Sequence, residues 1–231
     1  MHRLGFNLKN LENIYIKLKS CAQISSINLI SHFACADELE NSYNQQQIKQ
    51  FNTFSPLTIQ WRSLANSAAI MSRKESHFDW VRPGIMLYGV SPFSATVLLA
   101  KCLKPVMSLS AQIIAIHQFE EGDSIGYGRQ WIADKSVRVG VVSCGYADGY
   151  PRQVPSGTSV LVRGKRVPLV GCVSMDMLTI DLSTAPEAHV GDLVQLWGEQ
   201  ILVNEIAESV GSIGYEVLSK VTSRVKRCYI S

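Results

Sequence analysis

Apolar residues in the first hundred positions alternate between helical and strand-like spacing. They recur at helical intervals from Lys9 to Lys19, a glutamine-rich helix is predicted around 38–51, and a short helix is predicted at 66–74. Short apolar runs that suit buried strands separate these helices, at 27–33, 57–65 and 81–89. This alternation favours a parallel sheet that is covered by helices.

Beyond Pro105 the chain changes to strand-like runs that are separated by Gly, Pro and Asp. The runs lie at 107–119, 137–145, 158–171, 175–183 and 192–198. Strands that follow one another after short turns are typical of antiparallel pairing, so this half is predicted to be mainly antiparallel β. Helical spacing returns at 201–211 and 215–225, before a last predicted strand at 227–230.

The change of pattern places a domain boundary near residues 101–105, between a domain at 1–100 and a domain at 101–231. The first domain contains three or four βα units, whereas a closed barrel needs eight. It is therefore either a small open fold or the later part of a barrel. An open parallel sheet leaves an unpaired edge, so we expect this half to be poorly soluble unless a separate N-terminal piece completes it.

Composition narrows the class of protein. The 231 residues are 46% hydrophobic and 18% charged, which is typical of a globular chain. The 22 basic and 19 acidic residues form no continuous basic stripe, so no nucleic-acid partner is expected. Six scattered cysteines without a CxxC pair indicate free thiols in a reducing cytoplasm. Neither a secretion signal nor a membrane span of about 18 apolar residues is present in the sequence, so no membrane association is expected.

Two segments of the second half carry tyrosines among glycines. The segment 142–155, VSCGYADGYPRQVP, ends a predicted strand and puts Tyr146 on a loop. The segment 124–131, SIGYGRQW, places Tyr127 between two glycines, which leave its phenol exposed. A tyrosine titrates near about 10, so it acts as a base at neutral pH only where a cation or donor stabilises the phenolate. The segment 142–155 also fits a polar turn whose tyrosines cover the edge of the core, and Tyr127 also fits an ordinary turn aromatic.

The first half contains groups that suit an anion. The amides of 82–89, RPGIMLYG, and the helix start at 66–69, NSAA, are suited to phosphate, and Ser67 adds a hydroxyl. An Asn-Ser pair before a helix is, however, more often a plain N-cap, as Asn66 would be. His32 lies beside acidic residues, but the histidines show no metal-ligand spacing, so no metal is expected and a hydrogen-bonded loop histidine is the simpler interpretation.

Taken together, eight segments in this order resemble the alanine racemase family, which interconverts L- and D-alanine with pyridoxal 5'-phosphate. The segments are MHRLGF, SHFACADE, SLANSAA, RPGIMLYG, SIGYGR, GYADGYPR, GCVSMDM and IGYEVLS, and they span the chain from Met1 to about Tyr229. The resemblance implies a partial TIM-type (β/α)8 barrel, of which only the C-terminal units are present, followed by a mainly antiparallel β domain. It also implies a cytoplasmic homodimer whose active sites are shared across the interface, and an isomerase that supplies D-alanine as a peptidoglycan precursor.

The resemblance assigns cofactor-binding roles in the family pattern. Arg82 matches the arginine that faces the pyridine nitrogen, and because an arginine does not give up its proton, that nitrogen is expected to stay unprotonated. His32 and Asn66 match supporting groups. The positions that hold the cofactor phosphate are matched by Ser67, Gly84, Ile85 and Tyr215.

The resemblance also assigns the substrate side of the site. Tyr127 matches the catalytic tyrosine, which is the base for the L-enantiomer and is presented across the dimer interface. Arg3 matches the arginine that grips the substrate carboxylate, a task that suits its planar fork of donors. Met175 matches a residue whose backbone contacts that carboxylate in the partner's site, although a buried methionine is usually only filler. Tyr146 matches the active-site entrance, near the substrate.

One departure from the family pattern concerns the second base. A racemase removes the α-proton from one face and returns it to the other, so two acid/base groups on opposite sides are the simplest arrangement. In the family that this chain resembles, which works through a pyridoxal-phosphate aldimine, these groups are the tyrosine and a Schiff-base lysine. That lysine belongs to a segment like AVVKANAYGHG, and none of the 11 lysines here has this context. We therefore expect this chain alone to be a truncated, inactive racemase. Two alternatives stay open: a non-catalytic fragment that binds a racemase subunit, and a fold-related pyridoxal-phosphate decarboxylase, which would be expected to carry an acidic residue in place of Arg82.

Overall fold

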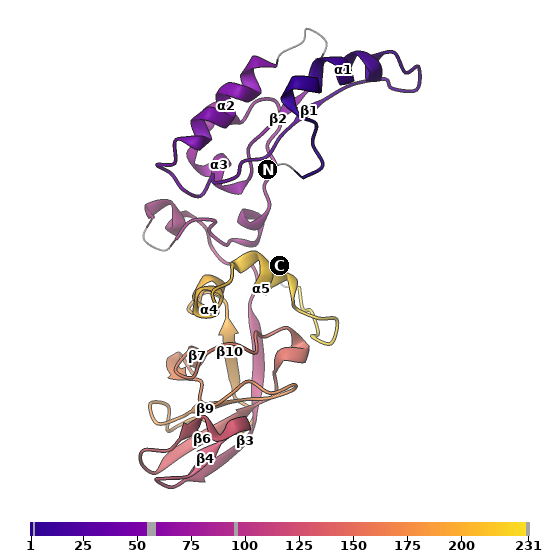
Figure 1. Cartoon of the computed structure of the whole chain (residues 1–231). Helices are drawn as coiled ribbons and strands as arrows, with labels where there is room; N and C mark the ends of the chain where they lie inside the picture. The colour runs from indigo at the N-terminus through magenta and orange to yellow at the C-terminus, as the bar shows by residue number, and fades with distance from the viewer. Residues whose placement is uncertain (2, 55–58, 95–96, 230–231) are drawn as a thin grey trace. The chain divides into compact units, whose positions relative to one another are not determined.

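The chain folds into two compact units, Met1–Leu103 and Lys104–Ser231 (Figure 1). The computed structural model describes residues 1, 3–54, 59–94 and 97–229. In these ranges, every helix is too short or too polar to cross a membrane.

The first unit pairs two short parallel strands between helices. In β1 (Leu29–Ile30) and β2 (Arg62–Ser63), Leu29 lies opposite Arg62, and a further parallel bridge joins Ser63 to Trp80. The helices are η1 (Leu8–Asn10), α1 (Leu11–Lys19), α2 (Tyr43–Thr53), α3 (Ser67–Ser72), η2 (Lys74–Ser76), η3 (Ile85–Tyr88) and η4 (Leu98–Cys102). This parallel β–α–β order confirms the expected α/β class with part of a TIM-type barrel.

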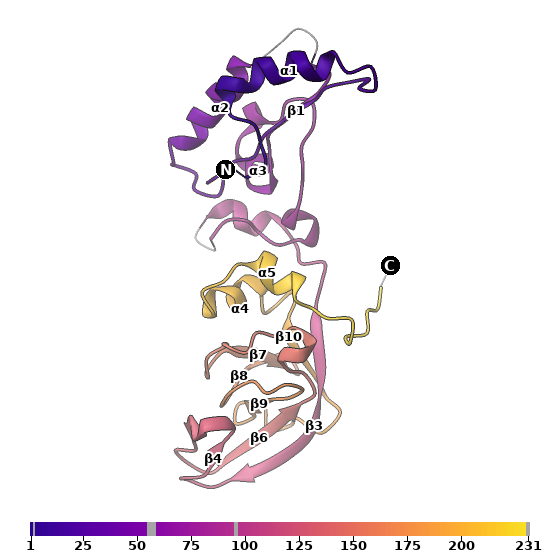
Figure 2. The same cartoon turned by 45° about the vertical axis from the view of Figure 1, so that its right-hand side comes forward.

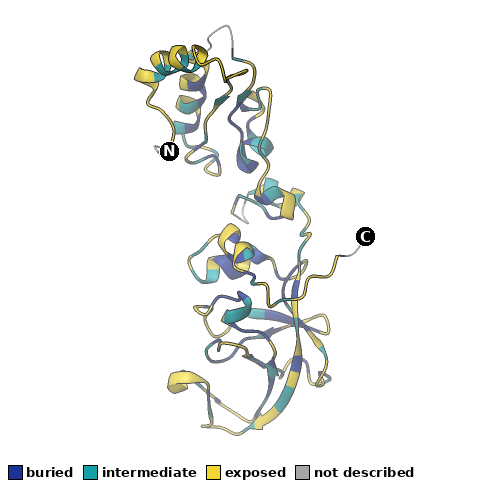
Figure 3. Ribbon diagram, turned by 90° about the vertical axis from the view of Figure 1, so that its right-hand side faces the viewer, coloured by how far each residue is buried: buried dark blue, intermediate teal, exposed yellow. Residues whose placement is uncertain are grey.

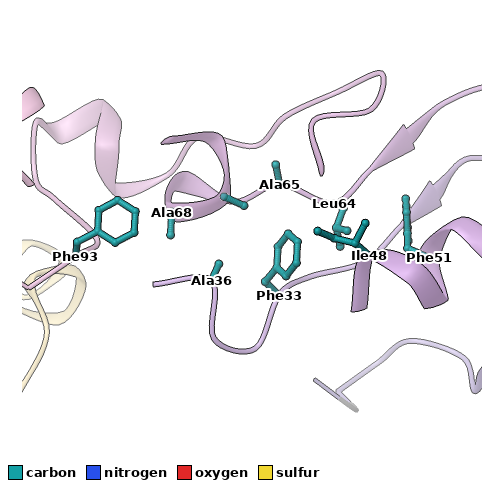
Figure 4. Packing of buried hydrophobic residues seen from close by; sticks show 9 residues of the cluster. Phe33, Ala36, Ile48, Phe51, Leu64, Ala65, Ala68 and Phe93 are labelled. Carbon is teal, nitrogen blue, oxygen red and sulfur yellow. The ribbon is translucent and has the colours of Figure 1, made fainter. Parts of the chain in front are cut away.

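The core of the first unit lies on one face of these strands. Ile48 and Phe51 of α2 pack with Phe33 and Leu64, and their side chains point toward those of the 64–68 segment (Figure 4). Ile30 and Trp80, in contrast, are 65% and 60% exposed. Parallel sheets normally bury both faces, whereas here Ile30 is exposed although Ser63, its partner across the strands, is buried.

Strands in this unit are shorter than the apolar runs predicted. Of each of the runs 27–33 and 57–65, only two described residues pair as a strand. Positions 57 and 58 lie outside the described residues. The strand predicted at 81–89 is wrong, because this segment turns into η3. Arg82 still donates its N–H to the carbonyl of Ala65 at 3.0 Å, but Pro83 has no N–H with which to continue the ladder.

The second unit is built on a six-stranded antiparallel sheet with the order β8-β7-β10-β3-β6-β9 (Figure 2). An antiparallel bridge from Leu169 to Ile180 joins its two ends, so the sheet is nearly closed. The strands are β3 (Leu109–Phe119), β6 (Val137–Val142), β7 (Ser159–Val162), β8 (Lys165–Pro168), β9 (Leu178–Asp181) and β10 (Leu193–Trp197). The expectation of a mainly antiparallel β domain is confirmed.

The long strand β3 organises this sheet. Its first half pairs with β10, with Gln112 opposite Leu193, and its second half pairs with β6, with Phe119 opposite Val137. Alternate residues of these strands point into the core, and Figure 3 shows the buried positions along them. Two helices, α4 (Val203–Ser209) and α5 (Gly214–Ser219), bury Ile206 and Val217.

The C-terminal part differs from the prediction. The helix predicted at 215–225 ends at Ser219, because the N–H of Thr222 donates to the carbonyl of Asp148 and not to the preceding helical turn. The strand predicted at 227–230 is wrong for its described residues, and Ile230 lies outside them. Tyr229 is 92% exposed, so this tail lacks the burial that would hold a strand.

Candidate active site

A hydroxyl and backbone amides converge at the start of α3. Ser67 is buried, and its Oγ accepts hydrogen bonds from the N–H of Gly84 at 2.8 Å and of Met86 at 3.4 Å. Ile85 is the first residue of η3, so its N–H has no acceptor in a preceding turn of that helix. Three of the four residues expected to hold a phosphate, Ser67, Gly84 and Ile85, therefore lie together. Hydroxyl and amide donors are the groups that bind phosphate in proteins.

Asn66 acts as the N-cap of α3, because its side-chain oxygen accepts a hydrogen bond from the N–H of Ala69 at 3.1 Å. We expect Asn66→Ala to lower the free energy of unfolding by about 1 kcal/mol, and Asn66→Asp, which keeps the acceptor, to stay close to the wild-type value. Urea unfolding of the 231-residue chain measures both. Equal losses in the two variants would contradict the capping role.

The guanidinium of Arg82 is held by the adjoining strand ends. It donates to Ser63 Oγ at 2.5 Å and to the carbonyl of Ser31 at 2.6 Å, and it lies 3.4 Å from Nδ1 of His32. Burial lowers the pKa of Arg82, but an arginine in a protein keeps its proton. The arrangement offers a fixed cationic donor that cannot act as an acid at neutral pH.

His32 completes this cluster as a neutral group. Burial, with the positive charges of Arg82, Arg3 and the N-terminus, holds the pKa of His32 below its ordinary value of 6.5. The neutral ring accepts from Arg82 through Nδ1 in the tautomer that carries its proton on Nε2. Arg3 is exposed and has no hydrogen-bond or ion-pair partner among the described residues. No set of three metal-binding side chains gathers within the described ranges.

In the second unit, Tyr127 stands on a short hairpin between β4 (Ser124–Ile125) and β5 (Trp131–Ile132). The flanking residues Gly126 and Gly128 have φ angles of 76° and 70°, in the left-handed region that glycine tolerates. Tyr127 is 71% exposed, and its hydroxyl has no partner in the described part of the chain. The ring of Tyr127 therefore lies on an exposed turn, a position that fits both a catalytic tyrosine and an ordinary turn aromatic.

Of the two tyrosines in the loop 145–150, one lies at the surface and the other in the core. Tyr146 opens η6 (Tyr146–Asp148) and is partly exposed. Tyr150 is buried and stacks on Trp197, with ring centroids 6.0 Å apart and planes at 10°. A ring that closes the core edge is thus the correct interpretation for Tyr150, while Tyr146 is available to a ligand.

Met175 lies beside Tyr146 on a second loop. The N–H of Tyr146 donates to the carbonyl of Ser174 at 3.0 Å, and the N–H of Ala147 donates to the carbonyl of Met175 at 3.0 Å. Met175 is 53% exposed, so it is not core filler, and its own N–H has no hydrogen-bond partner among the described residues. The structure therefore brings together two residues that were expected to face substrate.

Tyr215, the fourth residue expected at the phosphate, is exposed near the start of α5 and belongs to Lys104–Ser231, whereas the other three belong to Met1–Leu103. The sequence did not reveal the ion pairs that Arg224 makes with Asp148, in the loop of Tyr146, and with Asp176, next to Met175. The pairing partners are far apart in the sequence, so no local pattern identifies them.

Family models and known proteins match this chain along its length. The model of the N-terminal domain of alanine racemase matches residues 1–92, and that of the C-terminal domain matches residues 106–229. The alanine racemase of Stutzerimonas stutzeri is 50% identical over 230 residues, and the biosynthetic alanine racemase of Pseudomonas aeruginosa is 52% identical over 229. These alignments cover 100% and 99% of this chain but 64% of each relative.

Solved structures show the same relationship. The crystal structure of the Pseudomonas aeruginosa biosynthetic alanine racemase has a TM-score of 0.95 at 52% identity and covers 100% of this chain and 64% of that one. The structure of the enzyme from Acinetobacter baumannii has a TM-score of 0.87 at 43% identity, over 97% of this chain and 62% of that one. The chain therefore belongs to the alanine racemase family.

Proposed function

We propose that this chain supplies the catalytic tyrosine and most of the binding residues of an alanine racemase that uses pyridoxal 5'-phosphate. The observation that carries the proposal is the placement of Tyr127 within a chain of this family. Its phenol is held outward between two left-handed glycines and has no partner among the described residues. A side chain in this position is free to meet a substrate.

The cofactor residues of the first unit fit this role. Ser67, Gly84 and Ile85, together with Tyr215, would bind the phosphate through hydroxyl and amide groups. Arg82, held in place by Ser63 and Ser31, would donate to the pyridine nitrogen and leave it without a proton of its own. When bound, the cofactor withdraws electrons from the α-carbon of the amino acid.

The substrate is proposed to be alanine, bound by its carboxylate and attacked at its α-proton. Among the described residues the guanidinium of Arg3 and the N–H of Met175 have no hydrogen-bond partner, and both suit a carboxylate. Tyr127 takes the α-proton from one face of L-alanine, and Tyr146 lines the approach to the site. We propose that Tyr127 and Met175 serve the site of a partner protomer in a homodimer.

A racemase also needs an acid or base on the opposite face. The lysine with this role in the family has no counterpart among the 11 lysines of the 231 residues, so these residues by themselves are proposed to bind but not to racemise. All six cysteines are unpaired, in keeping with a reducing cytoplasm as the proposed location.

A coupled D-alanine assay on two proteins tests this proposal. The first is the 231-residue chain. The second, called the extended protein here, has the part of the Pseudomonas aeruginosa relative that this chain does not span joined ahead of Met1. We expect racemisation only by the extended protein, and covalent retention of the cofactor after borohydride reduction only there. A folded extended protein that binds the cofactor but leaves L-alanine unchanged would contradict the proposed function. Turnover by the 231-residue chain would contradict the role of the missing lysine.

A further inference from the structure

Arg224 joins two loops that carry substrate-facing residues. Its Nε lies 3.4 Å from Oδ1 of Asp148, in the loop 145–150, which carries Tyr146. Its terminal nitrogen lies 2.5 Å from Oδ1 of Asp176, in the loop 174–177, which carries Met175. One guanidinium thus contacts a carboxylate from each loop through two different nitrogens, and its rigid planar fork fixes these two contacts relative to each other.

Asp148 connects this ion pair to the backbone under Tyr146. Its Oδ2 accepts a hydrogen bond from the N–H of Gly145 at 2.9 Å, while Oδ1 faces Arg224. Cys144 is a titratable group beside Asp148, and burial, followed by the charge of Asp148, raises the pKa of its thiol to about 12. Cys144 is therefore neutral at physiological pH, and Arg224 carries the positive charge that faces Asp148.

The backbone around Arg224 follows the same loop. Thr222 donates its N–H to the carbonyl of Asp148 at 3.1 Å and its hydroxyl to the carbonyl of Ala147 at 2.9 Å. At Gly149, an added Cβ would lie 2.3 Å from the carbonyl oxygen of Lys220. Residues 220–224 therefore form a strap that contacts the loop 145–150 at three successive positions.

The two loops also touch each other directly. The amides of Tyr146 and Ala147 donate to the carbonyls of Ser174 and Met175, each at 3.0 Å. A Cβ on Gly145 would lie 2.3 Å from both of these carbonyl oxygens. Because the loops are in direct contact, any change that separates them also changes the position of Tyr146 relative to Met175.

We infer that Arg224 is a positioning residue, which clamps the loops 145–150 and 174–177 together and so fixes Tyr146 and Met175 relative to each other for substrate binding. The role in substrate binding rests on the proposed function, whereas the contacts between Arg224 and the two loops do not depend on it. The Arg224–Asp176 pair is exposed on both sides and Arg224 is also half exposed where it meets the more buried Asp148, so these pairs contribute little to global stability. Loss of Arg224 is expected to alter the position of the loops far more than the stability of the unit.

Amide hydrogen exchange on the 231-residue chain tests the clamp without any activity. With Arg224→Gln, exchange at Tyr146, Ala147 and Thr222 should accelerate about tenfold while the amides of β3 and β6 keep their protection. Arg166→Gln is the matched control, because Arg166 is similarly exposed and pairs with Glu205 at 2.7 Å elsewhere in the same unit. Unchanged exchange at all three reporters, or equal acceleration in the control, would overturn the inference.

Kinetics of the extended protein test the consequence for substrate. Arg224→Gln should raise KM for alanine roughly tenfold and change kcat by less than about twofold, because it disturbs binding and not proton transfer. Arg224→Lys should fall between, and Arg166→Gln should match the wild-type protein. If exchange accelerates but KM is unaltered, Arg224 is merely structural and the inference fails. An inactive unsubstituted extended protein would instead reject the proposed function and leave the exchange result to decide the clamp.

Discussion

Tyr127→Phe in the extended protein is expected to lower racemisation of L-alanine by roughly 10²- to 10⁴-fold, the range of a lost general acid or base. The phenol is 71% exposed and has no partner among the described residues, so its loss removes no packing. The unfolding midpoint should therefore stay unchanged. Tyr229→Phe is a matched control, because Tyr229 is exposed and lies in the C-terminal tail, and it should retain full activity.

Deuterium exchange into L- and D-alanine shows which proton transfer the Tyr127→Phe variant loses. If Tyr127 serves only the L face, solvent deuterium should stop entering the α-position of L-alanine but continue to enter that of D-alanine. Proton NMR in deuterium oxide measures both rates. Equal loss of exchange from both enantiomers would show that Tyr127→Phe impairs cofactor or substrate binding and not one proton transfer.

Gly149→Ala is expected to have the largest effect on stability. Gly149 has φ = 107°, and the added Cβ would lie 2.3 Å from the Lys220 carbonyl oxygen, a backbone atom that cannot rotate away. The unfavourable φ costs about 1–2 kcal/mol and the overpacking adds about 1–3 kcal/mol. Urea unfolding of the 231-residue chain should show a loss of about 3 kcal/mol in the free energy of unfolding.

Gly157→Ala separates the two causes. Gly157 has a similar φ of 95°, but its added Cβ would meet no atom within 4 Å. This variant should lose only the backbone cost, about 1–2 kcal/mol. Equal losses at the two positions would contradict the close contact between the strap 220–224 and the loop 145–150.

The strand-like runs of the second unit predict its antiparallel class but not its strand order. A short turn joins β7 to β8, whereas β10 pairs with β3 and β6 pairs with β9 across long stretches of sequence. The sequence does not show the near-closure of the sheet, which depends on a bridge between Leu169 and Ile180. In the first unit, apolar runs predicted strands that the structure shortens to two residues. Parallel strands are normally buried within larger sheets, and β1 pairs only with β2 in the described part of the chain.

The local sequence predicts the exposure of a site residue only where neighbouring residues fix the backbone conformation. The glycines around Tyr127 force a hairpin that presents its ring to solvent. Tyr146 and Tyr150 share one loop, and their opposite environments depend on Trp197, which is distant in the sequence and stacks on Tyr150. The role of Arg224 is equally non-local, because both of its carboxylate partners come from other segments.

Mixing two inactive variants of the extended protein tests most directly the claim that Tyr127 serves the site of a partner protomer. One variant carries Tyr127→Phe, and the other has the family lysine replaced by alanine. In a freely exchanging mixture half of the dimers are mixed, and each mixed dimer has one complete site, so activity should return to about a quarter of the unsubstituted level. Activity that stays at the level of the separate variants, while differently tagged subunits co-purify as mixed dimers, would contradict the shared site.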